Sequence, residues 1–176
     1  AGLALVLRGY RRDRDGRVTA PRGSRVSPVR RDEIARLLRH QLDPRPMVDL
    51  GRAIAEAGIA SAAIDLSDGF ARDLHRLCRA SGAGASVERE ALPVDSGLAM
   101  LPGLPSDPLE LALYGGEDYG LLFAVPPERV PAMRKAAARF AVRRVGRLDA
   151  TSKVVLSEAG RSRPLPDRGF DHFSKG

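Results

Sequence analysis

Two aspartates and a serine stand close together where the chain changes from an apolar to an amphipathic pattern. Asp65, Ser67 and Asp68 follow the apolar residues 62–64 and precede a segment whose apolar side chains recur at helical spacing. The pattern predicts a short buried strand, a polar turn and a helix. Carboxylate oxygens suit Mg²⁺, and a hydroxyl together with the free N–H groups of a helix start can donate to a phosphate. The turn therefore favours a metal-bridged nucleotide phosphate.

A second interpretation of the same turn stays open at this point. Ser67 or Asp68 can act as the N-cap of the helix, with Gly69 easing the turn, and such caps are far more common than metal sites. Asp65 favours the metal, because a carboxylate at the end of an apolar strand is costly unless it is paired or ligated. Two aspartates in one turn are a weak signal when taken alone.

Composition restricts the class of protein. The chain has 176 residues, 43% of them hydrophobic, which suits a folded domain with a core. No apolar run approaches the roughly 20 residues of a membrane span, so we expect no membrane partner. Cys78 is the only cysteine, and with no recognisable signal peptide this favours the cytoplasm. The net charge is +7, but 5% aromatic residues and no tryptophan leave little to stack bases on, so we expect no nucleic-acid partner.

The order of elements predicts the fold class. Residues 1–31 are expected to hold the end of a helix from a longer protein and a flexible loop, because residues 11–31 are rich in Arg, Gly, Pro and Ser. Residues 32–176 are expected to form one α/β domain with a mixed sheet covered by helices. We expect helices at 32–42, 48–57, 68–80, 108–113 and after 127, a short helix near 96–100, and strands at 60–65, 85–90, 119–125, 142–148 and 153–156.

Three separated segments carry a resemblance to a known family. They read Ile-Asp-Leu-Ser-Asp-Gly at 64–69, Gly-Gly-Glu-Asp-Tyr at 115–119 and Gly-Phe-Asp-His-Phe at 169–173. In this order and at these intervals the chain resembles the C-terminal domain of thiamine-monophosphate kinases, which belong to the aminoimidazole-ribonucleotide synthetase superfamily. Two positions depart from the usual pattern: Gly120 replaces a glutamate, and Phe70 replaces a leucine. Neither departure removes a ligand.

The resemblance implies an activity and a set of residues for it. The reaction would be ATP-dependent phosphorylation of thiamine monophosphate to thiamine diphosphate, with Mg²⁺. Asp65 and Asp68 match metal-binding aspartates, and Ser67 matches an ATP contact. Glu117 matches a substrate contact and Phe170 an aromatic position that packs on the substrate. No catalytic side chain is expected, because a phosphate oxygen of the substrate attacks.

The resemblance also implies that part of the active site lies elsewhere. The N-terminal half of this family carries further metal-binding aspartates, much of the ATP site and the main dimer contacts. We therefore expect a homodimer for the complete protein and no activity for this chain alone. Glu117 and Phe170 are expected to face one concave site, with the Asp65–Asp68 turn further from Phe170. The alternatives are a superfamily member with a different phosphate acceptor, or a non-catalytic domain that has lost its N-terminal half.

Overall fold

The chain folds into two compact units. The computed structural model describes residues 2–95, 97–98 and 107–170. Unit 1 comprises Ala1–Arg45 and Val94–Leu111, and unit 2 comprises Pro46–Pro93 and Ala112–Gly176. Residues 32–45, which the sequence analysis grouped with the C-terminal domain, thus belong to unit 1. Across the described ranges, no helix is both long enough and apolar enough to cross a bilayer.

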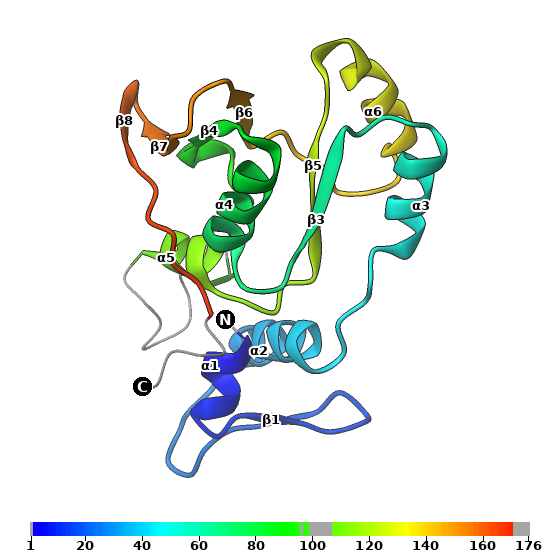
Figure 1. The fold of residues 1–176 in the computed structure, drawn as a ribbon. Coiled ribbons are helices and arrows are strands. Elements are labelled where there is room, and N and C mark those ends of the chain that lie inside the picture. The colour runs from blue at the N-terminus through cyan, green and yellow to red at the C-terminus, as the bar shows by residue number, and fades with distance from the viewer. Residues whose placement is uncertain (1, 96, 99–106, 171–176) are drawn as a thin grey trace. The chain divides into compact units, whose positions relative to one another are not determined.

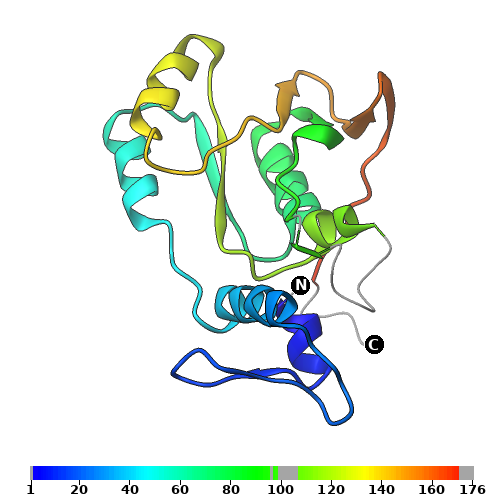
Figure 2. The same cartoon turned by 180° about the vertical axis from the view of Figure 1, so that it is seen from behind.

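Unit 1 is built on two helices and a small hairpin. Helix α1 (Gly2–Leu7) packs against α2 (Pro28–Leu42), and strands β1 (Arg11–Arg12) and β2 (Val18–Thr19) pair antiparallel, below both helices in Figures 1 and 2. Helix α2 begins at Pro28 because Ser27 Oγ accepts a hydrogen bond from the Arg30 N–H at 3.4 Å and proline suits a first helical turn. The core of the unit consists of Leu5, Ile34, Leu37, Leu38 and Leu98.

The arginine-rich segment has more structure than its composition indicates. The prediction of a loop without strand or helix over residues 11–31 is wrong, since the segment contains the β1–β2 hairpin and the start of α2. The carboxylate of Asp13 closes the hairpin by accepting from the Arg17 N–H at 2.8 Å. Gly16 supplies a left-handed residue there, with φ of 85°. The predicted short helix near 96–100 falls mostly outside the described residues.

Unit 2 contains the sheets that position the predicted site. Its elements are α3 (Val48–Glu56), β3 (Ala62–Leu66), α4 (Phe70–Ser81), β4 (Gly84–Glu88), the 3-10 turn η1 (Arg89–Ala91), the end of α5 (Pro108–Tyr114), β5 (Gly120–Ala124), the 3-10 turn η3 (Pro127–Arg129), α6 (Val130–Ala136), β6 (Gly146–Asp149), β7 (Val154–Glu158) and β8 (Arg161–Pro164). Strand β3 pairs antiparallel with β5. The other sheet has the order β6-β4-β7-β8, in which only β4 and β7 run parallel. The predicted α/β class with mixed strand directions is confirmed.

Two helices pack at the end of the β3–β5 pair where β3 begins and β5 ends. A third helix lies between the two sheets. Helices α3 and α6 lie side by side in both views (Figures 1 and 2). They share a core of Leu50, Ile54, Ile59, Met133 and Ala137, with Phe123 of β5 packed against it. Helix α4 contacts both β3 and β4. Its start is therefore fixed at the end of β3.

The structure contains a strand, β8, after the last strand expected at 153–156. Residues 158–160 turn the chain into β8 rather than into the tail, with Ala159 and Gly160 at φ of 48° and 79°. The tail after β8 (red in Figure 1) then runs beside α4. His75 Nε2 donates to the Leu165 carbonyl at 2.8 Å, and Arg79 Nη1 lies 2.7 Å from an Asp167 carboxylate oxygen. These contacts lead the tail towards the N-terminal end of α4.

The pairing of β6 with β4 can be tested by a substitution at one glycine. A Cβ at Gly146 would lie 2.2 Å from the Ser86 carbonyl oxygen on the neighbouring strand, so Gly146→Ala should lower the free energy of unfolding by about 1–3 kcal/mol. Gly51→Ala is the matched control, because the nearest atom to its added Cβ is Leu121 Cδ1 at 3.5 Å. That change inside α3 should stabilise the chain by about 0.5–1 kcal/mol. Urea unfolding followed by circular dichroism measures both, and equal stability of the two variants would contradict the β4–β6 pairing.

Candidate functional site

The polar turn predicted to do chemistry joins β3 to α4. The N-cap residue of α4 is Gly69, with φ of 110°, and not Ser67 or Asp68 as the capping interpretation had it. A Cβ at Gly69 would lie 3.1 Å from the carbonyl carbon of Tyr114, so the turn packs closely on the backbone at the end of α5. Both the φ angle and this contact require glycine here.

The backbone of this turn brings the three sequence motifs together. Three consecutive carbonyl oxygens accept hydrogen bonds from the other two motifs. The carbonyl of Leu66 accepts from the Tyr119 N–H at 2.9 Å, that of Ser67 from the Glu117 N–H at 2.8 Å, and that of Asp68 from the Phe170 N–H at 2.8 Å. Segments separated by about 50 residues in the sequence thus meet at one junction, which we call the three-motif junction (residues 66–69, 115–119 and 169–170).

Glycines in the two partner motifs permit this approach. A Cβ at Gly116 would lie 2.8 Å from the Ser67 carbonyl oxygen, and one at Gly169 would lie 2.3 Å from that of Asp68. The latter distance is shorter than any non-bonded carbon–oxygen contact, so no side chain fits without moving the backbone. The glycines of the motifs are therefore explained by the packing of backbone on backbone.

The loop that carries Glu117 is held in an unusual conformation. Glu117 and Tyr119 have φ of 65° and 50°, in the left-handed region that non-glycine residues rarely adopt. Their N–H groups are those bound to the Ser67 and Leu66 carbonyls, which fixes the loop in this state. Both side chains are exposed. Backbone strain of this kind is concentrated at functional sites.

The two predicted metal-binding aspartates differ in their surroundings. Asp65 lies on the exposed side of β3, so the argument that it is buried at the end of an apolar strand is wrong. Its carboxylate has no ion-pair or hydrogen-bond partner among the residues that the structure describes. Asp68 is only 7% exposed, and its carboxylate forms an ion pair with Arg76. Ser67 is half-buried between them.

Two residues of α4 that the sequence analysis did not select complete the surroundings of Asp68. Asp73 is 0% exposed. Its Oδ2 accepts from the Asp68 N–H at 3.0 Å, and its Oδ1 lies 3.1 Å from Arg76 Nη1. The hydrogen bond with Asp68 is the main cause that raises the pKa of Arg76. The three-residue spacing of Asp73 and Arg76 was the available signal, since such residues are neighbours on a helix.

The oxygen ligands present fit Mg²⁺ only in part. In the described part of the chain, no group of three or more His, Cys, Asp or Glu side chains could hold a metal ion. The exposed Asp65 carboxylate can contribute one ligand, whereas that of Asp68 is shared with Arg76. Mg²⁺ usually takes one or two protein carboxylates together with phosphate oxygens and waters. The donor set is therefore compatible with a metal that arrives with a phosphate.

Phe170 lies at the junction with its ring accessible. The residue is 54% exposed, so it is not a core side chain. The expectation that the Asp68 turn lies away from Phe170 is wrong, because the two backbones are hydrogen-bonded neighbours. A Cβ at Gly116 would lie 3.5 Å from the Phe170 Cβ, which places the Glu117 loop beside Phe170 as well. Residues 171–173 of the motif lie outside the described residues.

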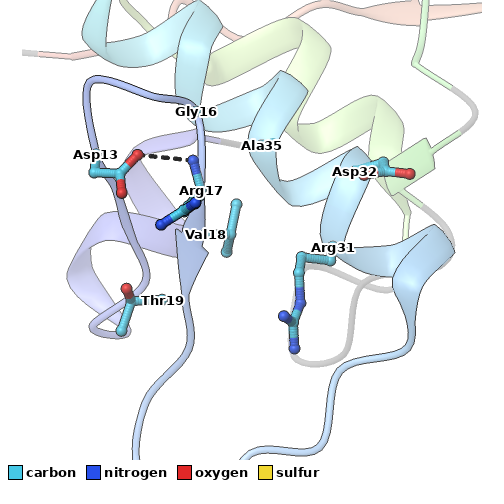
Figure 3. Close-up of a pocket in the computed structure, with 8 residues that line it drawn as sticks. All are labelled: Asp13, Gly16, Arg17, Val18, Thr19, Arg31, Asp32 and Ala35. Atoms are coloured by element: carbon cyan, nitrogen blue, oxygen red, sulfur yellow. Dashed lines mark hydrogen bonds between the residues drawn. The ribbon is translucent and has the colours of Figure 1, made fainter.

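A hollow in unit 1 is a separate feature. Figure 3 shows a pocket of about 500 Å³ between the β1–β2 hairpin and α2. Its charged lining combines Asp13 and Asp32 with Arg17 and Arg31, without an excess of either sign. None of the sequence-predicted site residues lines it. The candidate site residues lie at the three-motif junction and not at this hollow.

Cys78 belongs to the core of unit 2. Its side chain is buried on α4, and this burial raises the pKa of the thiol. The thiol therefore remains protonated at neutral pH and is a poor nucleophile. Cys78 is thus placed as a structural residue of the core.

Comparison with known proteins gives the family. The family model for AIR synthase related protein, C-terminal domain, matches residues 22–158. The thiamine-monophosphate kinase of Halobacterium salinarum is 40% identical over 127 residues, which cover 72% of this chain and 41% of that protein. That of Salmonella typhimurium is 36% identical over 149 residues, covering 78% and 42%.

A solved structure agrees in fold and in family. The structure of AaThiL complexed with AMPPCP and TMP superposes with a TM-score of 0.72 at 27% identity, covering 98% of this chain and 47% of that chain. The chain thus spans about two fifths of the length of the curated relatives it matches. The resemblance to thiamine-monophosphate kinases is confirmed, and the chain belongs to the AIR synthase related proteins, of which it contains the C-terminal domain.

Proposed function

We propose that this chain is the C-terminal part of a kinase that transfers a phosphoryl group from ATP to thiamine monophosphate. The observation that carries the proposal is the three-motif junction, where acidic, hydroxyl and aromatic side chains project from segments tied together by three backbone hydrogen bonds. The kinship with thiamine-monophosphate kinases supports the reaction. The similarity to AaThiL complexed with AMPPCP and TMP supports both ligands.

In this proposal the turn after β3 binds the nucleotide phosphates. Asp65 and Asp68 are the Mg²⁺ ligands, and Ser67 contacts ATP. The donor and the acceptor both carry phosphate and repel each other, and with Mg²⁺ bound this charge is neutralised. Asp65 presents its carboxylate to solvent, where a metal–phosphate complex can reach it. Asp68 forms an ion pair with Arg76, and this contact orients the Asp68 carboxylate as a metal ligand.

The other two motifs bind the acceptor. Phe170 offers an accessible ring face to the flat, cationic ring system of thiamine monophosphate. Glu117 accepts a hydrogen bond from the amino group of the same molecule. No side chain is proposed as a catalytic base, because the attacking group is a phosphate oxygen of the acceptor. The protein positions the two reactants and helps to neutralise the charge of their phosphates.

The rest of the protein is part of the proposal. Since the chain spans about two fifths of its curated relatives, the remaining nucleotide and metal contacts are assigned to the part that those relatives have in addition. We propose a cytoplasmic homodimer as the working form, and no turnover by the 176-residue chain alone. That chain therefore serves as the background sample in the assays below.

The metal role is tested by removing one charge at an exposed position. In the complete protein that carries this chain, Asp65→Asn should lower kcat/KM by about 100-fold, as expected for the loss of a few kcal/mol of charge stabilisation. Folding should be unaffected, because Asp65 is exposed. The measurement is turnover against Mg²⁺ concentration at fixed ATP. Asp49→Asn, which removes the same charge at an exposed position of α3, is the control, and equal Mg²⁺ curves for both variants would refute the role.

The acceptor role is tested by separating two Michaelis constants. Phe170→Ala should raise the KM for thiamine monophosphate about fivefold to tenfold, the equivalent of roughly 1 kcal/mol of ring contact. The KM for ATP should stay the same, and Phe170→Tyr, which keeps the ring, should behave as the wild type. Glu117→Gln should also raise the KM for the acceptor alone. A change in the KM for ATP with no change for thiamine monophosphate would assign Phe170 to the nucleotide instead.

A further inference from the structure

Helix α4 carries a buried carboxylate whose two oxygens have different tasks. Asp73 is fully buried, and a buried carboxylate is costly unless donors surround it. One oxygen accepts from the Asp68 N–H at 3.0 Å. The other lies 3.1 Å from Arg76 Nη1, and Arg76 in turn contacts the Asp68 carboxylate. Asp73 thus holds Asp68 at its backbone directly and at its side chain through Arg76.

The backbone contact extends further than Asp68. The N–H of Asp68 and the carbonyl of Ser67 belong to one peptide group, which is planar and rigid. Asp73 binds the N–H side of this group, and the Glu117 N–H binds the carbonyl side at 2.8 Å. A rotation of this peptide would break both hydrogen bonds together. One planar group therefore links a helix residue to the strained loop that presents Glu117.

The side-chain contact is of a different kind. Arg76 is 44% exposed in its side chain, and its guanidinium can donate to both carboxylates at the same time. It keeps Asp68 and Asp73 from repelling each other across the first turn of α4. Without Arg76, the Asp68 carboxylate would lose this ion pair, while the Asp68 N–H would keep its hydrogen bond with Asp73.

We infer that Asp73 is a positioning residue for both halves of the proposed site. Through the Ser67–Asp68 peptide it positions the Glu117 loop, and through Arg76 it positions the Asp68 carboxylate. The inference rests on the proposed function for the meaning of the two halves, but the positioning itself is a property of this chain. Substitutions that remove one task and keep the other separate the two.

Three variants distinguish the tasks. Asp73→Asn keeps an oxygen for the Asp68 N–H but loses the charge that holds Arg76. It should therefore raise the Mg²⁺ concentration needed for half-maximal turnover about tenfold and leave the KM for thiamine monophosphate unchanged. Arg76→Gln should behave in the same way. Asp73→Ala loses both contacts and should raise that KM about tenfold as well. Glu158→Ala, which breaks the 3.1 Å ion pair between Arg89 and the exposed Glu158, is the matched control and should change neither quantity.

Amide hydrogen exchange on the 176-residue chain gives a readout independent of catalysis. Asp73→Ala should speed exchange at Asp68 and at Glu117 by at least about tenfold, because the shared peptide is released. Arg76→Gln and Glu158→Ala should leave both amides protected. Faster exchange at Asp68 with Glu117 still protected would overturn the peptide link. If Asp73→Ala does not fold, unchanged Mg²⁺ dependence in Asp73→Asn and Arg76→Gln overturns the side-chain task.

The two readouts also separate this inference from the proposed function. If the complete wild-type protein does not phosphorylate thiamine monophosphate, the proposed function fails, while hydrogen exchange still decides whether Asp73 holds the peptide. If the wild type is active and all variants match it in KM and Mg²⁺ dependence, the inference fails and the proposed function stands.

Discussion

The structure depends on three consecutive backbone carbonyls at the end of β3. A strand that ends in a turn commonly leaves such groups to water, but here residues 66–68 accept hydrogen bonds from Tyr119, Glu117 and Phe170. Each bond contributes only about 1 kcal/mol in net terms. Their importance is geometric, because they fix two distant segments against the start of α4. Backbone segments that are remote in the sequence thereby meet at one junction.

The local conformations around the junction follow from this constraint. Glu117 and Tyr119 adopt left-handed φ angles of 65° and 50°, each at a cost of about 1 kcal/mol or more, because their N–H groups must reach those carbonyls. Gly116 and Gly169 have no space for a Cβ for the same reason. Asp73 adds a hydrogen bond from inside unit 2 to the same turn. Three segments of unit 2 thus hold the turn, which preorganises it.

The sequence predicts those features that depend on local pattern. The helical period of residues 70–81 and the apolar run before it predicted α4 and β3 to within two residues. The exposure of Asp65 could not be predicted, because it depends on which face of β3 the other elements cover. The spacing of Asp73 and Arg76 indicated their ion pair, but the hydrogen bond of Asp73 with the Asp68 backbone N–H could not be predicted from a residue pattern. Strand β8 was missed because Arg161 and Arg163 are exposed, which leaves no apolar alternation to detect.

We propose above that the three-motif junction binds both reactants. A crystal structure of the complete protein with Mg²⁺, AMPPCP and thiamine monophosphate tests it most directly. We expect the nucleotide phosphates and the metal to lie at Asp65 and Asp68, and the thiamine ring to lie on Phe170 within reach of Glu117. A structure in which both ligands are bound while Glu117 and Phe170 contact neither would contradict the proposed function.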